Sequence, residues 1–222
     1  MMKSMILVLT LVVLAAGAFA SGGAYLDDLR IANNGLAVFS DNFDDGKLDG
    51  WMRINDTTVT CNTPGKPPCG MFVNAQKYRA TAYHSLTLRN AGLIEVSAKV
   101  YLTAPEEQYE WQIRKQAAFL GIHLYSGSST AIMQLDIQLD PGQQQAKLCV
   151  ARKDKAQCQP SNPLAKYRWA NITLRMDPKT KTASALLEGQ PQVSLPYEPE
   201  EWRSIREVGI NSSYGDGSQH TD

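Results

Sequence analysis

Hydrophobic and polar residues alternate with a period of two along most of this chain. The clearest alternating segments are residues 36–40, 83–89, 93–102, 117–125 and 130–139, and shorter ones follow at 145–151, 168–176, 182–188 and 206–212. This alternation is typical of β-strands that bury one face and expose the other. The pattern predicts an all-β protein, a two-sheet antiparallel sandwich of about a dozen strands.

Turn-forming residues separate these segments. Asn, Gly, Pro, Asp and Ser cluster at residues 90–92, 126–128, 140–142 and 177–179, where tight turns are expected. Three segments lack the alternation. Residues 63–70 form a Pro/Gly-rich loop, residues 104–116 could form one helical turn or a strand extension, and residues 199–205 could form one helical turn.

A hairpin is expected near the N-terminus. Residues 24–31 and 36–43 flank Asn33-Asn34-Gly35. Asn and Gly tolerate the positive φ angles that type I′ turns and G1-bulge loops require. The two segments are therefore predicted to pair as antiparallel strands.

Residues 1–20 have the pattern of a signal peptide. Lys3 precedes an apolar core over residues 6–16, and Ala18-Phe19-Ala20 forms an A-x-A cleavage site. No later stretch approaches the roughly 18 apolar residues that a membrane-spanning helix needs. We therefore expect a single domain over residues 21–222 that is secreted, extracellular or periplasmic, and not inserted in a membrane.

The charge balance limits which partners are expected, and the cysteine content indicates the redox compartment. The chain has 22 basic and 22 acidic residues, so nucleic acid and anionic membranes are not expected partners. Nothing in the sequence indicates an oligomeric state. Four cysteines in an exported chain are expected to form two disulfides. Their spacing favours the local pairs Cys61–Cys69 and Cys149–Cys158, although three connectivities are possible, and zinc binding is disfavoured because no C-x-x-C is present.

Two alternating segments place aromatic and polar side chains together. If the aliphatic residues of 117–125 and 130–139 face the core, the intervening residues share the opposite face. A sugar needs this mixture, because flat rings pack on its C–H patches and polar groups bind its hydroxyls. The alternative is an ordinary solvated sheet face. Trp111, in the charged segment 106–115, is a candidate for an exposed stacking platform. The candidate ligand-binding residues are therefore His123, Tyr125, Gln134, Asp136, Gln138 and Trp111.

The segment Ser40–Trp51, SDNFDDGKLDGW, resembles the opening of the concanavalin A-like lectin/glucanase superfamily, which includes laminin-G-like jelly rolls. Residues 24–31, AYLDDLRI, resemble the closing strand of those domains, and residues 206–222 resemble the strand and loop that normally precede it. The resemblance implies a concanavalin A-like jelly roll that is circularly permuted. A fragment cut before its own closing strand is the alternative.

The same resemblance bears on function. Gln134-Leu135-Asp136-Ile137-Gln138 resembles the E-x-D-x-E motif of laminarinase-like hydrolases with both Glu positions replaced by amides. An amide can neither attack the anomeric carbon nor donate a proton to the leaving oxygen. The resemblance therefore implies a non-catalytic, carbohydrate-binding domain. Alternatives are a glycan-active hydrolase, either laminarinase-like or similar to 3-keto-disaccharide hydrolases, and a laminin-G-like adhesion module that binds protein.

Calcium is the cofactor that the resemblance suggests. Relatives hold a structural ion where the opening and closing strands meet, and hard oxygen ligands suit Ca²⁺. Carried over to this chain, Asp28 (or Asp27) would supply the carboxylate, with Asp41 and Gly92 nearby. The alternative is that the two carboxylates only flank a bend.

Overall fold

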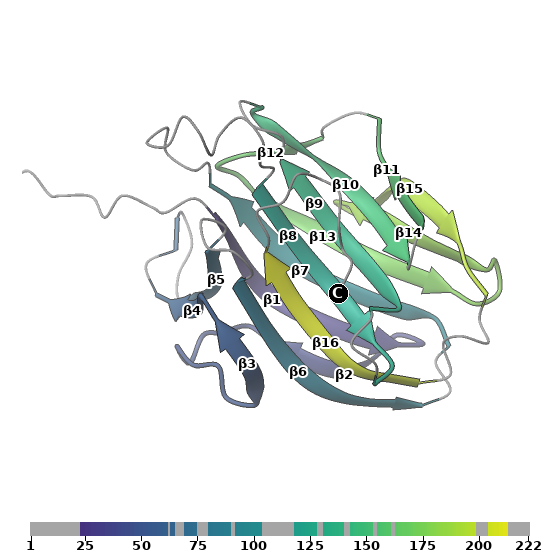
Figure 1. The fold of residues 1–222 in the computed structure, drawn as a ribbon, viewed down its shortest axis with the longest axis horizontal. Coiled ribbons are helices and arrows are strands. Elements are labelled where there is room, and N and C mark those ends of the chain that lie inside the picture. Colours follow the sequence, from purple (N-terminus) through teal and green to yellow (C-terminus); the bar gives the residue numbers. More distant parts are fainter. Residues whose placement is uncertain are drawn as a thin grey trace, which may run out of the picture.

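The computed structural model folds into two antiparallel sheets of eight strands each, packed face to face. In Figure 1 the strands β8, β9, β16 and β6 lie in front of β7, β1 and β13. The structure describes residues 23–61, 63–64, 69–74, 80–89, 92–103, 118–127, 131–139, 143–152, 155–160, 163–198 and 204–212. The predicted signal peptide and Trp111 lie outside these residues.

The first sheet, sheet A, has the strand order β15-β14-β13-β7-β1-β5-β4, with β2 paired to β1. Its strands are β1 (Gly23–Asn33), β2 (Leu36–Asp41), β4 (Thr57–Thr60), β5 (Gly70–Asn74), β7 (Ile94–Leu102), β13 (Trp169–Asp177), β14 (Thr182–Leu187) and β15 (Gln190–Pro196). The strand nearest the N-terminus, β1, therefore lies inside the sheet.

The second sheet, sheet B, has the strand order β11-β10-β9-β8-β16-β6-β3, with β12 paired to β10. Its strands are β3 (Trp51–Asn55), β6 (Ala80–Arg89), β8 (Ala118–Tyr125), β9 (Met133–Leu139), β10 (Gln145–Arg152), β11 (Lys155–Cys158), β12 (Leu164–Ala165) and β16 (Ser204–Ser212). The last described strand, β16, lies between β8 and β6.

The core fills the space between the sheets with the aliphatic residues of each alternating strand. On β7, the residues Ile94, Val96, Ala98, Val100 and Leu102 are buried, whereas the residues between them are half-buried. Because every second side chain of a strand points to the same face, this pattern fixes which face of each strand meets the core.

The predicted N-terminal hairpin is confirmed. β1 and β2 pair antiparallel with Asn33 opposite Leu36. The two loop residues, Asn34 and Gly35, both have positive φ angles, 50° and 82°, as a type I′ turn requires. Every segment predicted from its alternation forms a strand. The strands β3, β4, β5, β11, β12 and β15 were not predicted, and Ser204 and Ile205 begin β16 rather than a helical turn.

Both predicted disulfides are present. Cys149 and Cys158 stand directly opposite each other on β10 and β11. Cys61 and Cys69 close the Pro/Gly-rich loop. Within that loop, the Pro64 carbonyl accepts a hydrogen bond from Trp169 Nε1 at 2.8 Å. Disulfides of this kind are typical of an oxidising compartment.

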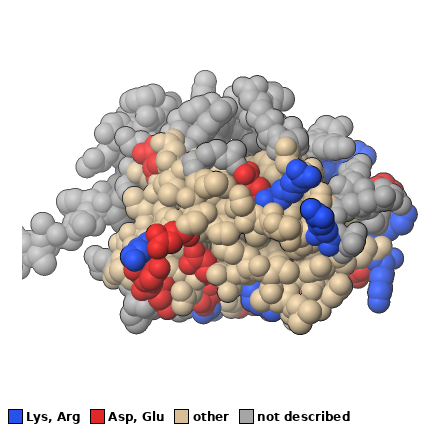
Figure 2. All heavy atoms as spheres, turned by 90° about the horizontal axis from the view of Figure 1, so that it is seen from below, with Lys and Arg blue, Asp and Glu red and all other residues tan. Residues whose placement is uncertain are grey.

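The described surface is mostly uncharged on the side that Figure 2 shows. Acidic side chains gather on one side of that view, and uncharged residues cover most of the rest. The turn after β2 carries the exposed carboxylates of Asp44, Asp45 and Asp49. Within the described residues, no helix has the length and apolar character needed to cross a membrane.

Candidate functional site

The polar face, as we call it here, is the outer face of sheet B, where the residues predicted to bind ligand come together. The register pairs His123 with Gln134 and Gly121 with Asp136 across β8 and β9. Leu120, Ile122 and Leu124, which alternate with these residues, are buried in the core. The prediction that the two polar sets share one face of the sheet is therefore confirmed.

The structure does not show the ordinary solvated sheet face that was the alternative interpretation. His123 is only 4% exposed and Asp136 only 2%, and Tyr125 and Gln134 are also buried. The reason is that these side chains contact one another rather than standing upright in solvent. Of the predicted set, Gln138 is half-buried, opposite Lys147 of β10.

A buried chain of polar contacts links Asp136, His123 and Tyr125. Asp136 Oδ1 lies 3.0 Å from His123 Nε2, and the Tyr125 hydroxyl lies 3.4 Å from His123 Nδ1. A neutral imidazole with its proton on Nε2 satisfies both contacts, because Nε2–H donates to the carboxylate and Nδ1 accepts from the hydroxyl. Asp136 thus holds the ring in the orientation that fixes Tyr125.

Tyr125 keeps its proton over a wide pH range. Burial raises the pKa of the Tyr125 hydroxyl far above its usual value. The neighbouring Tyr83 hydroxyl and Glu207 carboxylate raise this pKa further, whereas a hydrogen bond with the Asn211 side chain lowers it. Tyr125 is therefore a neutral hydrogen-bond donor on this face, not a phenolate.

Two glycines make room for these side chains. A Cβ atom at Gly209 would lie 2.7 Å from Tyr83 Cε1 and 3.0 Å from Tyr125 Cε2, and one at Gly121 would lie 2.8 Å from Asp136 Oδ1. Side chains at these two positions would collide with their neighbours. The Tyr83 and Tyr125 rings, whose centroids are 5.7 Å apart, can therefore lie close against the sheet.

Strand β16 supplies polar groups on both sides of this tyrosine pair. Glu207, Gly209 and Asn211 alternate along one face of the strand, with Glu207 opposite Tyr125 and Gly209 opposite Tyr83. The Tyr83 hydroxyl donates to Asn211 Oδ1 at 3.1 Å. This bond orients the amide, and its Nδ2 is buried on the side of the Tyr125 hydroxyl.

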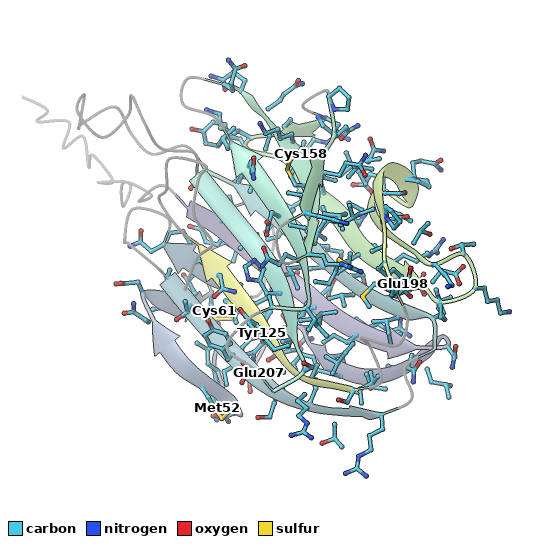
Figure 3. All side chains as sticks on the ribbon, turned by 45° about the vertical axis from the view of Figure 1, so that its right-hand side comes forward. Met52, Cys61, Tyr125, Cys158, Glu198 and Glu207 are labelled. Carbon is cyan, nitrogen blue, oxygen red and sulfur yellow. A yellow bond between two sulfur atoms is a disulfide. The ribbon has the colours of Figure 1, made fainter. Side chains whose placement is uncertain are left out.

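The accessible part of the polar face lies over β6, β16 and β3. Tyr83, Asn211 and Glu207 are half-buried there, and Met52 of β3, opposite Tyr83, is 41% exposed. Figure 3 places Tyr125 and Glu207 next to each other, with Met52 beyond them. These accessible residues were not predicted. Period-two alternation puts Tyr83 and Asn211 on the outer face of their strands, but no sequence pattern places those strands beside β8.

The amides Gln134 and Gln138 of β9 cannot act as the catalytic carboxylates of a glycosidase. Gln134, Asp136 and Gln138 lie on one face of β9, so Asp136 is the carboxylate of this motif. Among the described residues of this face, the next carboxylate by register is Glu207. It stands opposite Tyr125, four residues along β8 from Gly121, or about 13 Å along the strand. Paired catalytic carboxylates stand about 5–9.5 Å apart.

Of the residues predicted to bind calcium, Asp41 stands opposite Leu29, beside Asp28, whereas Gly92 lies further along β1. The Asp28 carboxylate pairs with Lys99, and the Asp41 carboxylate accepts hydrogen bonds from Phe43 N and Trp51 Nε1. Gly92 donates to Asn33 instead, about 16 Å along β1 from Asp28. Within the described residues, no group of three His, Cys, Asp or Glu side chains could hold a metal ion. Calcium stays a prediction that these contacts do not support.

Comparison with known proteins defines the fold class. No family model matches the chain. No curated protein matches it. Among solved structures, the globular domain of T. cruzi calreticulin is similar over 78% of this chain and 82% of that one, at 9% identity with a TM-score of 0.51.

Two further structures extend the comparison. Basic winged bean lectin with Tn-antigen is similar over 87% of this chain and 88% of that one, at 11% identity and a TM-score of 0.49. Crh5 transglycosylase in complex with NAG is similar over 86% and 71%, at 13% identity and a TM-score of 0.42. At such identities the likeness concerns the fold alone. The chain has a concanavalin A-like jelly-roll fold, as the opening motif predicted.

Proposed function

We propose that this protein is a secreted, non-catalytic carbohydrate-binding domain that contacts glycan through the polar face of sheet B. One observation carries the proposal. The half-buried Tyr83 ring packs at an angle against the buried Tyr125 ring over Gly209, and β16 places a carboxylate at Glu207 and an amide at Asn211 on either side of this pair.

This arrangement has the chemistry that a pyranose ring needs. Aromatic rings bury the C–H patches of a sugar, and the flanking carboxylate and amide can bind its hydroxyls.

Two disulfides and the leader-like residues 1–20 support secretion. Disulfides persist in oxidising compartments, and the A-x-A sequence at Ala18–Ala20 matches a cleavage site.

Glycan binding is tested with a glycan array and with binding titrations on the glycans that the array retains. We expect Tyr83→Ala to weaken affinity about tenfold or more, because losing an aromatic contact costs about 1.4 kcal/mol or more. Asn211→Ala should weaken it by a similar factor. Tyr167→Ala is the matched control, since Tyr167 is 57% exposed and neighbours Tyr101 of sheet A. Failure to retain any glycan, or equal affinities in all three variants, would contradict the proposal.

A glycan-active enzyme is the second candidate function. The contacts from Asp136 through His123 to Tyr125 link three groups that can carry protons, and this favours acid–base chemistry. Incubation with laminarin, lichenan and a 3-keto-disaccharide tests it. Turnover that disappears in His123→Asn would replace the non-catalytic proposal, whereas binding without turnover would support it.

A further inference from the structure

We infer that the outer face of sheet A is a second binding surface, and that its ligand is a proline-rich polypeptide segment in the extended polyproline II conformation. This surface lies on the other sheet from the polar face, so the inference goes beyond glycan binding. A row of aromatic side chains across neighbouring strands carries it.

The aromatic row, as we call it, consists of Phe72, Tyr25, Tyr101 and Trp169. Tyr25 of β1 stands opposite Phe72 of β5 and opposite Tyr101 of β7. Tyr101 in turn stands opposite Trp169 of β13. Consecutive ring centroids are 4.9, 6.2 and 5.5 Å apart. The residues that alternate with these four belong to the core, so the row lies on the outer face of sheet A, turned away from the viewer in Figure 1.

Tyr167 extends the row from the turn before β13. Its ring centroid lies 6.5 Å from that of Tyr101, and its side chain is 57% exposed. Its φ angle is +59°, which is a strained conformation for a bulky residue. The Tyr167 N–H donates to the Leu102 carbonyl at 2.9 Å and so holds the turn. Strain of this kind is typical of binding sites. Because the ring gains little burial in return, a contact with a ligand explains its position better than packing does.

The spacing of the row matches the repeat of a polyproline II helix. Neighbouring strands lie about 4.8 Å apart, so rings on alternate strands, such as Phe72 and Tyr101, are separated by about 9.6 Å. A polyproline II helix has three residues per turn and rises about 3.1 Å per residue, so its side chains repeat on one face about every 9.3 Å. Residues i and i+3 of such a segment would therefore contact rings on alternate strands.

The tilt of the rings favours proline over sugar. Consecutive rings of the row are inclined by 45°, 74° and 50° to one another. Inclined rings present a proline side chain with two aromatic surfaces at once, as in the aromatic-lined sites that bind proline-rich segments. A pyranose stacks on one flat face instead.

Hydrogen bonding on this face fits the same ligand. Trp169 Nε1 donates to the Pro64 carbonyl at 2.8 Å, so a proline of this chain's own Pro/Gly-rich loop contacts one end of the row. A polyproline II segment makes no internal hydrogen bonds, and its carbonyls are free to accept. Within the described part of the chain, no residue bonds to the hydroxyls of Tyr25, Tyr101 and Tyr167. Burial, and then a neighbouring tyrosine, raises the pKa of Tyr25 and of Tyr101, so both hydroxyls remain donors at neutral pH.

Charged groups flank the row on its β13 side. Lys99 pairs with Asp28, and the exposed Arg168 acts on the Glu188 carboxylate. Lys166 is half-buried. These carboxylates compensate the cations in part, so ring contacts and hydroxyl donors define the ligand more than charge does.

Titration calorimetry with a decaproline peptide tests the inference. A Gly-Ser peptide of the same length is the matched ligand, because it is a flexible coil. We expect the wild type to bind decaproline at least tenfold more tightly than the Gly-Ser peptide. Tyr101→Ala should weaken decaproline binding at least fivefold, because an aromatic contact is lost. Leu36→Ala is the control, since Leu36 is an exposed apolar residue of the same sheet outside the row, and it should leave this affinity unchanged.

Two substitutions at Tyr167 separate lost binding from lost folding. Tyr167→Ala and Tyr167→Gly both remove the ring, but glycine adopts a positive φ without strain. Both variants should bind decaproline at least fivefold more weakly than the wild type. Tyr167→Gly should nevertheless unfold at a higher urea concentration than Tyr167→Ala.

Equal affinity of the wild type for the two peptides would overturn the inference, and so would undiminished binding in Tyr101→Ala and both Tyr167 variants. Either result would leave glycan binding at the polar face intact. A loss of glycan affinity in Tyr167→Ala would assign the row to sugar and would also overturn the inference.

Discussion

Tyr125 owes its properties to its neighbours rather than to its place in the sequence. Its ring packs against the Tyr83 ring over Gly209. Its hydroxyl contacts His123, which Asp136 orients. A buried phenol of this kind keeps its proton in the folded protein at a pH where the unfolded chain has lost it.

This difference predicts a loss of stability at alkaline pH. The folded pKa of Tyr125 is raised above the unfolded value of about 10. The contribution of Tyr125 to the free energy of unfolding is therefore fully present below pH 10. It falls as the pH rises further, by up to about 1.4 kcal/mol per pH unit for each such tyrosine. Burial also raises the pKa of Tyr197 to about 12, so it contributes as well. Urea unfolding between pH 8 and 11 should show a shallower decline for Tyr125→Phe than for the wild type.

Tyr167→Phe serves as the control because the Tyr167 side chain is largely exposed. Its decline should match that of the wild type. Identical slopes for Tyr125→Phe and the wild type would show that Tyr125 ionises equally in both states.

At the scale of single residues, the sequence predicted which face of sheet B carries His123 and Asp136, but not that these side chains are buried. Alternation alone placed His123 and Asp136 on the same side of the sheet, because strand geometry fixes that choice. Their burial depends on glycine at positions 121 and 209 and on β16 lying beside β8. Those contacts join residues nearly 90 positions apart, and no local pattern encodes them.

Among the strands, β11 depends on a covalent link. It has four residues, three of them exposed, and it pairs with β10 around the Cys149–Cys158 disulfide. So short and polar an edge strand buries little apolar surface. We expect Cys149→Ala/Cys158→Ala to lower the free energy of unfolding by about 2–3 kcal/mol, from the loop entropy of a crosslink this short. Hydrogen exchange should also speed up in β11.

The other disulfide provides the comparison. Cys61–Cys69 closes a loop of nearly the same length on sheet A, where Trp169 binds Pro64. Its removal should cost a similar free energy of unfolding. Glycan affinity should fall only when Cys149 is replaced, since Cys149 lies opposite Asp136. Equal effects on affinity would argue against a contribution of β11 to the polar face.

The strands missed by prediction share a physical cause. β4 and β5 flank the Pro/Gly-rich loop, whose turn residues obscure their short alternation, and β11 is Lys-Ala-Gln-Cys, with little apolar content. These strands form because a neighbouring strand or a disulfide holds them. Long alternating segments such as residues 94–102 were predicted within one residue of their ends.

In the molecule as a whole, the first described strand stabilises the centre of sheet A. β1 pairs with β2, β5 and β7, and Leu29 on it is fully buried. Leu29→Ala should therefore lower the free energy of unfolding by about 2–5 kcal/mol. Leu36→Ala, seven residues away at a side chain 76% exposed, should change it by no more than about 0.5 kcal/mol. Urea denaturation of both variants checks the difference, and equal losses would mean that β1 is not a central strand.

The sequence resemblance predicted the fold class, and the turn residues Asn33-Asn34-Gly35 predicted the hairpin that joins β1 to β2. Circular permutation remains a prediction, because residues 213–222 lie outside the described part of the chain. The pairing of β1 with β2 is what that hypothesis requires. It is equally what the Asn-Gly turn alone would produce.

The interior position of β16 has a consequence for how the chain acquires its structure. Sheet B cannot join β8 to β6 until residues 204–212 have been made. Until then the edges of β8 and β6 that β16 covers are unpaired, and unpaired strand edges invite pairing with another chain. A chain shortened before residue 204 is therefore expected to aggregate.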